Sequence, residues 1–523
     1  MTRKVVFFLI IVLAALLRLA YLAGAPPSLN WDEVSVGWNA YSLLTTSRDE
    51  YGQSFPLSIR SFNDYKPPLY TYATAAAMAL LGKTEIAVRL PSALAGLLTV
   101  VLIFFLGRVS GLGGKANFRF AYLSAFLLSV SPWHIQLSRI AFEASLALFF
   151  FLFGLALILF YFRHPTTKLL AILSATGFVL STYAHHSVKI FLPLFTLLFA
   201  AAYRQQITKN WPKLLPALVI GAILLLPLGR NMLYTSGQAT RALTVSIFAP
   251  ENQFHFQGKS TLQVLTENYL SHLDPAFLFF GRGDNPRHHA PDTGVVLLWT
   301  APFIILGLIY LIRHRPKYLA LLLIWFVLSP VPAILSIDNP HASRSFLSLP
   351  IYVFLTALGI LFLAKRRALA ALGIGLLLVF NLLYFFHQYF SDLSIRDAPA
   401  WQYGYKQLVE RLDSVSSSRY RKIYVSTAYD QPYIYFLFYG HSDPWIKNDG
   451  SFSQALGKIS FVNFKNWRQS DWDALDADDL LVLTSTDPQD GLTIIEEINY
   501  PDSQVAFRIT QPISRHGVIL ITP

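Results

Sequence analysis

The chain has 523 residues, of which 54% are hydrophobic, 15% aromatic and only 14% charged. Soluble domains carry about 25% charged residues, so this balance excludes an ordinary soluble protein and indicates an integral membrane protein. The chain has no cysteine, which excludes disulfides, thiolate metal sites and cysteine nucleophiles.

Apolar runs predict eleven membrane-spanning helices. A bilayer core needs about 20 apolar residues per helix, and somewhat fewer where polar ends anchor it. The predicted spans are 5–23, 89–107, 119–133, 143–162, 168–184, 189–203, 214–229, 294–312, 318–335, 346–364 and 368–387.

The basic residues predict the orientation of these spans. With the N-terminus inside, every inner segment carries Lys or Arg and none carries Asp or Glu. The net charge of +12 is therefore a topology signal, and we expect no nucleic-acid partner. The long outer regions are 24–88, 230–293 and the tail after about 390. The shorter outer turns are 134–142, 185–188 and 336–345.

Arg18 interrupts the first apolar run, and we expect its guanidinium to snorkel to the outer interface. The first run also fits a secretory signal peptide with a cleavage site at 23–25. The polytopic chain that follows favours an uncleaved first helix.

The first outer region opens with the adjacent acids Asp32 and Glu33 between Trp31 and Trp38. The simplest interpretation is a solvated loop with two charges and two interfacial aromatic anchors. A catalytic site at the membrane surface is the sharper hypothesis.

The same region continues with FNDYKPPLYTY, residues 62–72, which holds Asp64 and Lys66. The proline pair predicts a helix that begins at its second member. The apolar stretch 69–82 is too short to span, so we expect a helix in the outer interface. The segment EIAVRLPSALAG, residues 85–96, contributes Arg89.

Three other outer turns hold polar groups, which are Arg139 with Glu143, His185 with His186 and Lys189, and Asp338 with His341 and Arg344. We expect Arg139 and Glu143, four residues apart, to share one helical face where the fourth span begins. Each charge alone fits an interfacial anchor. Their occurrence on one side of the membrane favours a function, because ionisable residues at membrane depth are costly.

The tail predicts one α/β domain over residues 391–523, outside the membrane, beside a transmembrane domain over 1–390. Helical spacing occurs in 405–415, and strands are expected at 422–428, 479–486, 503–510 and 517–523. The aromatic stretch 431–440 is expected in a core. No glycine-rich phosphate loop follows these strands, so a nucleotide site is not expected.

The outer side thus combines carboxylates with cations. Carboxylates can orient and deprotonate a hydroxyl or amine acceptor, and Lys and Arg can hold a phosphate as it leaves. Aromatic residues and the interfacial helix could accommodate a lipid chain.

The ordered motifs resemble the GT-C glycosyltransferases of the protein O-mannosyltransferase and aminoarabinose-transferase families. The matching features are the Asp32-Glu33 pair, KPPLY (66–70), VRLPSALAG (88–96) and SRIAFEASL (138–146). The resemblance is clearest before residue 150 and extends through the span pattern to about 390. It implies the GT-C fold, a polytopic α-helical membrane protein with about eleven spans and interfacial helices in the first outer loop.

The resemblance also implies roles for residues. Asp32 would meet the acceptor as base or orienter with Glu33 in support, and Glu143 matches a further acidic position. Lys66 matches a lysine that contacts the donor phosphate. Arg139 and Arg344 are expected near that phosphate, and the remaining candidates are Asp64, Arg89, His185 and His341.

The chain departs from one family pattern. Some aminoarabinose enzymes have a glutamate immediately before the lysine, where this chain has Tyr65. No cofactor is implied with certainty, and a divalent metal is left open. Histidines at span ends are more often hydrogen-bonding residues than metal ligands, and no spacing here indicates a firm ligand set.

The resulting hypothesis is an inverting glycosyltransferase of the plasma membrane, with a cytoplasmic N-terminus and an outer active site. Its donor would be a sugar on polyprenyl phosphate, and its acceptor a lipid, a protein or a cell-envelope glycan. The alternatives are a transporter or flippase of lipid-linked sugars, an outer-face oligosaccharide ligase or polymerase, and a non-enzymatic scaffold.

Overall fold

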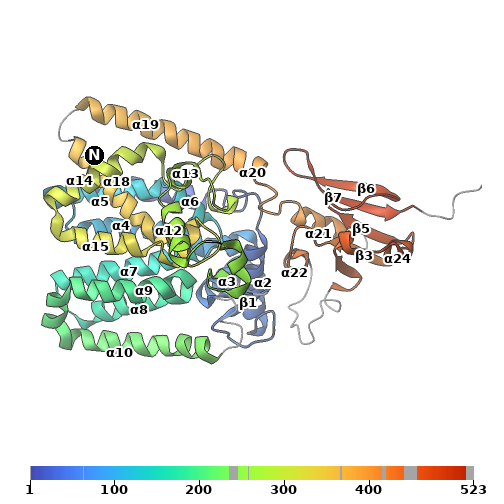
Figure 1. Cartoon of the computed structure of the whole chain (residues 1–523), viewed down its shortest axis with the longest axis horizontal. Coiled ribbons are helices and arrows are strands. Elements are labelled where there is room, and N and C mark those ends of the chain that lie inside the picture. Colours follow the sequence, from blue (N-terminus) through green and yellow to red (C-terminus); the bar gives the residue numbers. More distant parts are fainter. Residues whose placement is uncertain are drawn as a thin grey trace, which may run out of the picture.

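The computed structural model describes residues 2–62, 64–165, 167–234, 245–256, 258–364, 368–414, 420–440 and 456–513. Helices lie side by side in one bundle, and a unit that contains a sheet lies at one end of it (Figure 1). The N-terminus lies at the opposite end of the bundle.

A helix occupies each segment that was predicted to span the membrane. These helices are α1 (Arg3–Leu19), α4 (Glu85–Ser110), α5 (Asn117–Ser129), α7 (Ala144–Arg163), α8 (Lys168–Ala184), α9 (His186–Ala202), α10 (Arg204–Tyr234), α14 (Ala301–His314), α15 (Pro316–Leu328), α18 (Leu349–Ala364) and α19 (Ala368–His387).

Five helical segments of the described chain are long and apolar enough to cross a membrane, by length and composition. They are Glu85–Ser110, Ala144–Arg163, Arg204–Tyr234, Ala342–Leu363 and Leu372–Arg396. Several of the other bundle helices are apolar but shorter than 18 residues, so the number of spans stays a prediction.

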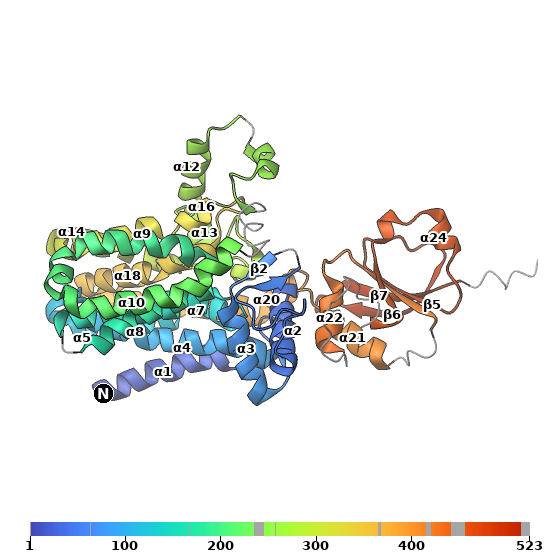
Figure 2. The same ribbon diagram turned by 90° about the horizontal axis from the view of Figure 1, so that it is seen from below.

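Short helices connect the long ones. They are η1 (Gly114–Ala116), α6 (Pro132–Arg139), η2 (Pro250–Phe256), α12 (Thr261–Ser271), α13 (Pro275–Phe280), η3 (Pro286–His288), η4 (Leu298–Thr300), α16 (Val331–Ile334), α17 (Ala342–Ser345), η5 (Phe346–Ser348), the π-helical η6 (Gln388–Asp392) and α20 (Leu393–Arg396). In the second outer region α12 projects sideways from the bundle (Figure 2).

The first outer region is more ordered than a solvated loop. It forms α2 (Trp31–Thr46), a hairpin of β1 (Ile59–Ser61) and β2 (Asp64–Lys66), and α3 (Pro68–Leu81). Helix α3 begins at the second proline, as predicted, because proline needs no N–H partner in the first helical turn.

The C-terminal unit contains α21 (Tyr405–Ser414), β3 (Lys422–Ser426), α22 (Pro432–Tyr439), β4 (Ile459–Val462), η7 (Phe464–Asn466), α24 (Gln469–Asp473), β5 (Asp479–Leu483), β6 (Leu492–Asn499) and β7 (Val505–Pro512). Its sheet has the order β4-β3-β5-β7-β6. The strands β4, β3 and β5 are parallel, while β7 and β6 form an antiparallel edge.

The structure confirms the predicted strands at β3, β5 and β7 and the helix at α21. It adds β4 and β6, which the sequence did not indicate. The strand predicted at 517–523 lies outside the described residues.

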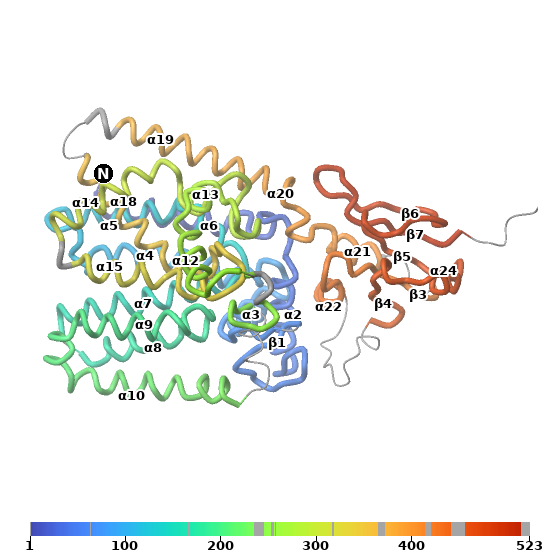
Figure 3. The backbone as a smooth tube through the Cα atoms, in the orientation of Figure 1, coloured from blue at the N-terminus to red at the C-terminus, as the bar shows by residue number. Residues whose placement is uncertain are grey.

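Helix α22 joins the C-terminal unit to the bundle and lies beside α2 and α21 (Figure 3). Its aromatic residues are buried, which confirms that 431–440 belongs to a core. A Cβ added at Gly37 of α2 would lie 2.7 Å from the Phe438 ring, so the two helices approach closely. The Tyr433 hydroxyl donates to Oε1 of Glu50, a buried carboxylate of the first outer region, at 3.0 Å.

Candidate active site

Asp32 and Glu33 lie in the first turn of α2, where the unpaired N–H groups of a helix favour acids. The Asn30 side chain accepts hydrogen bonds from the N–H groups of Asp32 and Glu33 at 3.0 and 3.3 Å. Glu33 Oε2 accepts the N–H of Asn30 at 3.2 Å, which completes a capping box. This box fixes both acids at the start of a rigid helix.

Glu33 is fully buried against Arg89 of α4. Arg89 Nε lies 2.9 Å from Glu33 Oε1, and Nη2 lies 3.1 Å from Oε2. Arg89 also donates to the carbonyl oxygens of Leu22, Pro26 and Ser28. Glu33 and Arg89 therefore hold the entire start of the first outer region against the bundle.

Asp32 faces a different environment, with its side chain 32% exposed. Lys66 Nζ lies 2.6 Å from Asp32 Oδ1, and the Lys66 side chain is 9% exposed. Lys66 ends β2 directly before the two prolines, which fix the chain that follows it. The hairpin thus positions the Lys66 ammonium beside Asp32 at the N-terminus of α2.

A second cation, Arg287, comes from the second outer region. Its Nη1 lies 3.6 Å from Asp32 Oδ2, and its guanidinium lies 4.9 Å from the centre of the Trp31 ring. Gln136 of α6 donates to the Arg287 carbonyl oxygen at 2.6 Å. Asp32 therefore lies between two cations from separate parts of the chain.

The sequence predictions missed Arg287. The available signal was the stretch DNPRHH, residues 284–289, which shares its first three residues and a following histidine with DNPH at 338–341. The expected aromatic anchors also differ from one another. Trp31 stacks on Arg287, whereas Trp38 is fully buried and cannot anchor in an interface.

Asp284, His288 and His341 form a cluster beside Arg287. Their potential ligand atoms all lie within 4.8 Å of one another. His288 Nδ1 lies 2.7 Å from Asp284 Oδ1, and both side chains are buried. These are the residues of the described chain that could hold a metal ion, and they include His341 from the predicted set.

The ionisation of this cluster follows from its surroundings. Burial and the nearby charges of Arg344 and His288 lower the pKa of His341 well below its ordinary value, so its ring is neutral. Burial alone would raise the pKa of Asp284, but His288, the N–H of Asn285 and His289 together more than offset it, and the pKa lies below its ordinary value. The Asp284 carboxylate is therefore charged at neutral pH.

Arg344, Asp64 and the histidines of the 185–188 turn have other partners. Arg344 donates to Ser336 Oγ at 2.5 Å and lies 3.6 Å from Asp338. Asp64 lies in β2 and accepts from the N–H of Tyr65. His186 contacts the Tyr65 carbonyl oxygen at 2.8 Å, and His185 caps α9 by accepting from Ser187. His186 thus ties the 185–188 turn to the hairpin that carries Lys66, while the contacts of Arg344 lie within the 336–345 turn.

Arg139 and Glu143 do not share a helical face. Helix α6 ends at Arg139, Ile140 is extended, and Glu143 directly precedes α7, so the predicted geometry is wrong. Arg139 donates five hydrogen bonds to the carbonyl oxygens of Leu17, Ala20, Tyr21 and Ala25. A guanidinium has five N–H groups, so none is left for a phosphate in this arrangement.

Arg18 does not snorkel to the interface. Its side chain is fully buried and donates to the carbonyl oxygens of Leu128 and Ser129 at 3.1 and 3.0 Å. It also lies 2.6 Å from His134 Nδ1. The guanidinium satisfies the carbonyl groups at the end of α5 instead of reaching water.

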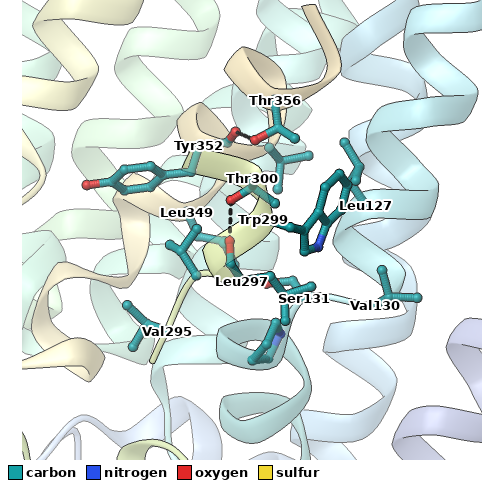
Figure 4. Close-up of a pocket in the computed structure, with 13 residues that line it drawn as sticks. Leu127, Val130, Ser131, Val295, Leu297, Trp299, Thr300, Leu349, Tyr352 and Thr356 are labelled. Carbon is teal, nitrogen blue, oxygen red and sulfur yellow. Dashed lines mark hydrogen bonds between the residues drawn. The ribbon is translucent and has the colours of Figure 1, made fainter. Parts of the chain in front are cut away.

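Two cavities lie away from Asp32. An apolar pocket of about 30 Å³ between α5, η4 and α18 is lined by residues such as Leu127, Trp299 and Tyr352 (Figure 4). A wider groove of about 610 Å³ runs between Gln53–Leu57 and the end of α10, where Arg230 lies. Neither is lined by Asp32, Lys66 or Arg287.

The arrangement around Asp32 can move a proton and hold an anion. A partly exposed carboxylate can accept a proton from a hydroxyl or amine. Lysine and arginine at its sides can stabilise negative charge that develops on a phosphate. Glu33 is sealed against Arg89 and fixes the start of α2 beside this group.

Residues 65–229 match the sequence model of the family described as dolichyl-phosphate-mannose-protein mannosyltransferase. No curated protein matches the chain. This segment begins next to Lys66 and includes α3 to α9 with most of α10.

Solved structures share the fold of the whole chain. ArnT from Cupriavidus metallidurans bound to undecaprenyl phosphate is 13% identical with a TM-score of 0.56, over 97% of this chain and 98% of that one. The same protein in the apo state is 12% identical with a TM-score of 0.54, over the same shares of the two chains. The Archaeoglobus fulgidus oligosaccharyltransferase in complex with Zn and sulfate is 11% identical with a TM-score of 0.51, over 96% of this chain and 72% of that one.

At these identities the similarity concerns the fold, and it extends through the C-terminal unit because nearly the whole chain is covered. The motifs on which the sequence resemblance rests lie in and before the segment matched by the family. The resemblance to the GT-C glycosyltransferases is therefore confirmed, and the chain has the fold of that superfamily.

Proposed function

We propose that the protein is an inverting glycosyltransferase that moves a sugar from a polyprenyl-phosphate donor to an acceptor at the outer face of the plasma membrane. The observation that carries the proposal is the partly exposed Asp32 carboxylate between Lys66 and Arg287. The acceptor is a lipid, a protein or a cell-envelope glycan.

The reaction is a single displacement at the anomeric carbon. The acceptor oxygen or nitrogen attacks C1 of the sugar, and the bond between C1 and the phosphate oxygen breaks with inversion. Asp32 takes the proton of the attacking group, and polyprenyl phosphate leaves with an added negative charge. Lys66 and Arg287 stabilise that charge, while Glu33 and Arg89 keep α2 in place.

Different observations support the outer position of the site and the polyprenyl-phosphate donor. Asp32 starts α2, which lies at the end of the bundle beside the C-terminal unit, opposite the N-terminus (Figure 2). Lys and Arg occupy the inner segments of the predicted topology, which directs the Asp32 end outward. Undecaprenyl phosphate is bound in the ArnT structure that shares this fold.

A transporter of lipid-linked sugars is the first alternative. Transporters place substrate sites near the middle of the bilayer, between repeats. Here the acid and its two cations lie at one end of the bundle, so the arrangement favours chemistry at a surface. An oligosaccharide ligase would use the same groups with a larger donor.

Asp32→Asn tests the proposal, because it removes the proton acceptor while it keeps the shape of the side chain. The purified protein is incubated with a panel of polyprenyl-phosphate sugars and acceptors, and both the released polyprenyl phosphate and the mass of the product are measured. We expect a loss of at least ~100-fold in kcat. A product one sugar heavier supports the proposed donor, and a product many sugars heavier indicates a ligase.

Asp274→Asn is the matched control. Asp274 caps α13 in the second outer region, and asparagine caps a helix equally well. This variant should transfer at the normal rate. Near-normal transfer by Asp32→Asn would refute the assignment, and flux across proteoliposomes without product would favour the transporter.

A further inference from the structure

A buried cluster of ligand-type side chains links two outer segments that are distant in the sequence. Asp284 and His288 come from the second outer region, and His341 comes from the turn before α17. The three groups supply one oxygen and two nitrogen donors, with all ligand atoms within 4.8 Å of one another. Two imidazoles and a carboxylate are a donor set that suits Zn²⁺ and similar divalent transition metals.

We propose that Asp284, His288 and His341 bind one divalent metal ion of the zinc type, and that this ion fastens the second outer region to the turn at 336–345. Three protein ligands leave one tetrahedral position for water. The metal binding rests on this geometry alone and does not depend on the proposed transferase activity.

The separations within the cluster fit a metal. Zn–N and Zn–O bonds of about 2.0–2.1 Å put tetrahedral ligand atoms about 3.3 Å apart. Asp284 Oδ1 and His288 Nδ1 lie 2.7 Å apart, so a small opening of this pair makes room for an ion in place of the shared proton. The remaining separations between ligand atoms are at most 4.8 Å.

Neighbouring groups hold the ligands in position, as outer-shell contacts do at metal sites. Asp284 Oδ2 accepts the N–H of Ala342 at 3.2 Å, and the N–H of His341 donates to His272 Nε2 at 3.1 Å. The Phe142 and His288 rings pack in a T-shaped arrangement with centroids 5.9 Å apart. The ligands are thus tied to both outer segments before any ion binds.

The nearby positive charges are balanced by other acids. Arg344 lies 3.6 Å from Asp338, and Arg287 lies 3.6 Å from Asp32. Each of these arginines thus has an acid other than Asp284 within 4 Å. A metal-free alternative is an ion pair of protonated His288 with Asp284 that braces the same two segments.

Such an ion has a consequence for the proposed active site, and this step rests on the proposed function. His288 directly follows Arg287, whose guanidinium lies against Trp31 and beside Asp32. A metal bound to His288 would hold Arg287 at the acid. Loss of the metal would weaken the contact between Arg287 and the donor phosphate more than it would change the protonation of Asp32.

The test measures metal in the purified full-length protein in detergent, without sugar substrates. After chelation and readdition of Zn²⁺, inductively coupled plasma mass spectrometry should find about one zinc per chain. The thermal midpoint should rise with added zinc. Because loss of outer-shell contacts alone costs 10–100-fold in affinity, His288→Gln should weaken binding at least ~100-fold.

His387→Gln is the control, since His387 lies on the exposed part of α19 with its side chain 65% exposed. This variant should keep one zinc per chain. A wild-type protein that binds no zinc, or a His288→Gln variant that binds as tightly as wild type, would overturn the proposal in favour of the ion pair.

A second variant guards against misfolding. His341→Cys replaces one ligand by another, so it should still bind metal. With Co²⁺ it should gain a near-ultraviolet band from thiolate-to-cobalt charge transfer, which His387→Cys should lack. A folded His341→Cys protein with Co²⁺ bound and no such band would exclude His341 as a ligand.

Discussion

Asp32 and Glu33 are neighbours in the sequence and yet meet opposite surroundings. Successive residues of a helix project about 100° apart, so one acid of the pair turns toward the bundle and the other toward the hairpin. Glu33 is sealed with Arg89 at full burial, and Asp32 keeps 32% of its side chain exposed. Asp32 is therefore open to solvent, while Glu33 is held inside the bundle.

Asp397 is an acid without such partners. It follows α20, and its Oδ2 is buried with no hydrogen-bond partner among the described residues. Burial raises its pKa to about 6. The folded protein thus holds the proton more tightly than the unfolded chain, so this group favours folding at low pH and that contribution is lost as the pH rises through about 6.

Asp397→Asn should therefore raise the thermal midpoint at pH 7.5 by a few degrees. The gain should vanish below pH ~4, where the carboxyl is protonated in both states. Scanning fluorimetry across this pH range measures the effect. Asp478→Asn, at an exposed position of the C-terminal unit, should change the midpoint at neither pH. An equal gain from Asp397→Asn at all pH values would contradict the explanation.

At the scale of elements, the apolar runs and the residues that start or end helices predict much of this fold. The apolar runs located the bundle helices, and Pro68 located the start of α3. The capping box at Asn30 was present in the sequence as Asn-x-x-Glu, but the polar residues after it resembled a loop. Strand β4 pairs with β3, and strand β6 pairs with β7. Neither segment shows a clear alternation of apolar and polar residues, so the sequence alone did not indicate them.

The sequence indicated some residues of the candidate site and missed others. Asp32 and Lys66 lie in motifs that follow the first predicted span, so the sequence indicated both. Arg287 lies in the short helix η3 of the second outer region, and no periodicity in the sequence predicts that this helix folds back onto Asp32. The role of Arg139 was equally hidden, because its partners are backbone carbonyl groups, which every residue has.

The contact of α14 with α18 depends on two glycines. A Cβ on Gly307 would lie 1.9 Å from the Leu355 carbonyl oxygen, and one on Gly359 would lie 2.0 Å from that of Phe303. Small residues let helices in membranes approach closely. Gly307→Ala or Gly359→Ala must therefore separate the helices, and each should lower the thermal midpoint in detergent by several degrees.

Gly229→Ala in α10 is the control, because an added Cβ there would have no atom of the described part of the chain within 4 Å. Alanine has the higher helix propensity, so this variant should be neutral or slightly stabilising. If all three variants melted alike, close packing of α14 and α18 would not be the cause.

At the scale of the whole molecule, the C-terminal unit touches the start of α2. Gln402 Oε1 accepts from the N–H of Trp31 at 3.0 Å and from the Tyr435 hydroxyl at 2.9 Å. The Tyr435 hydroxyl also contacts the Leu29 carbonyl oxygen, and its ring stacks on Tyr405 at 4.3 Å. Trp31, the residue before Asp32, is thus held by Gln402, which lies 371 positions further along the chain.

The predicted topology can be tested directly because the chain has no cysteine. Thr266→Cys in α12 and Thr208→Cys at the start of α10 are a matched pair at exposed positions. In intact cells a membrane-impermeant maleimide should label Thr266→Cys and leave Thr208→Cys unlabelled. Both should be labelled after the cells are opened. The reverse pattern would place Asp32 on the inner side.

The 2.6 Å contact of Lys66 with Asp32 also sets an order of events. In the proposed reaction, the ammonium stays paired with the carboxylate until a donor is present. A donor phosphate would then compete for the same ammonium and release the acid for the acceptor. The protein should therefore bind its two substrates in sequence, donor first, and product-inhibition kinetics should exclude a random order.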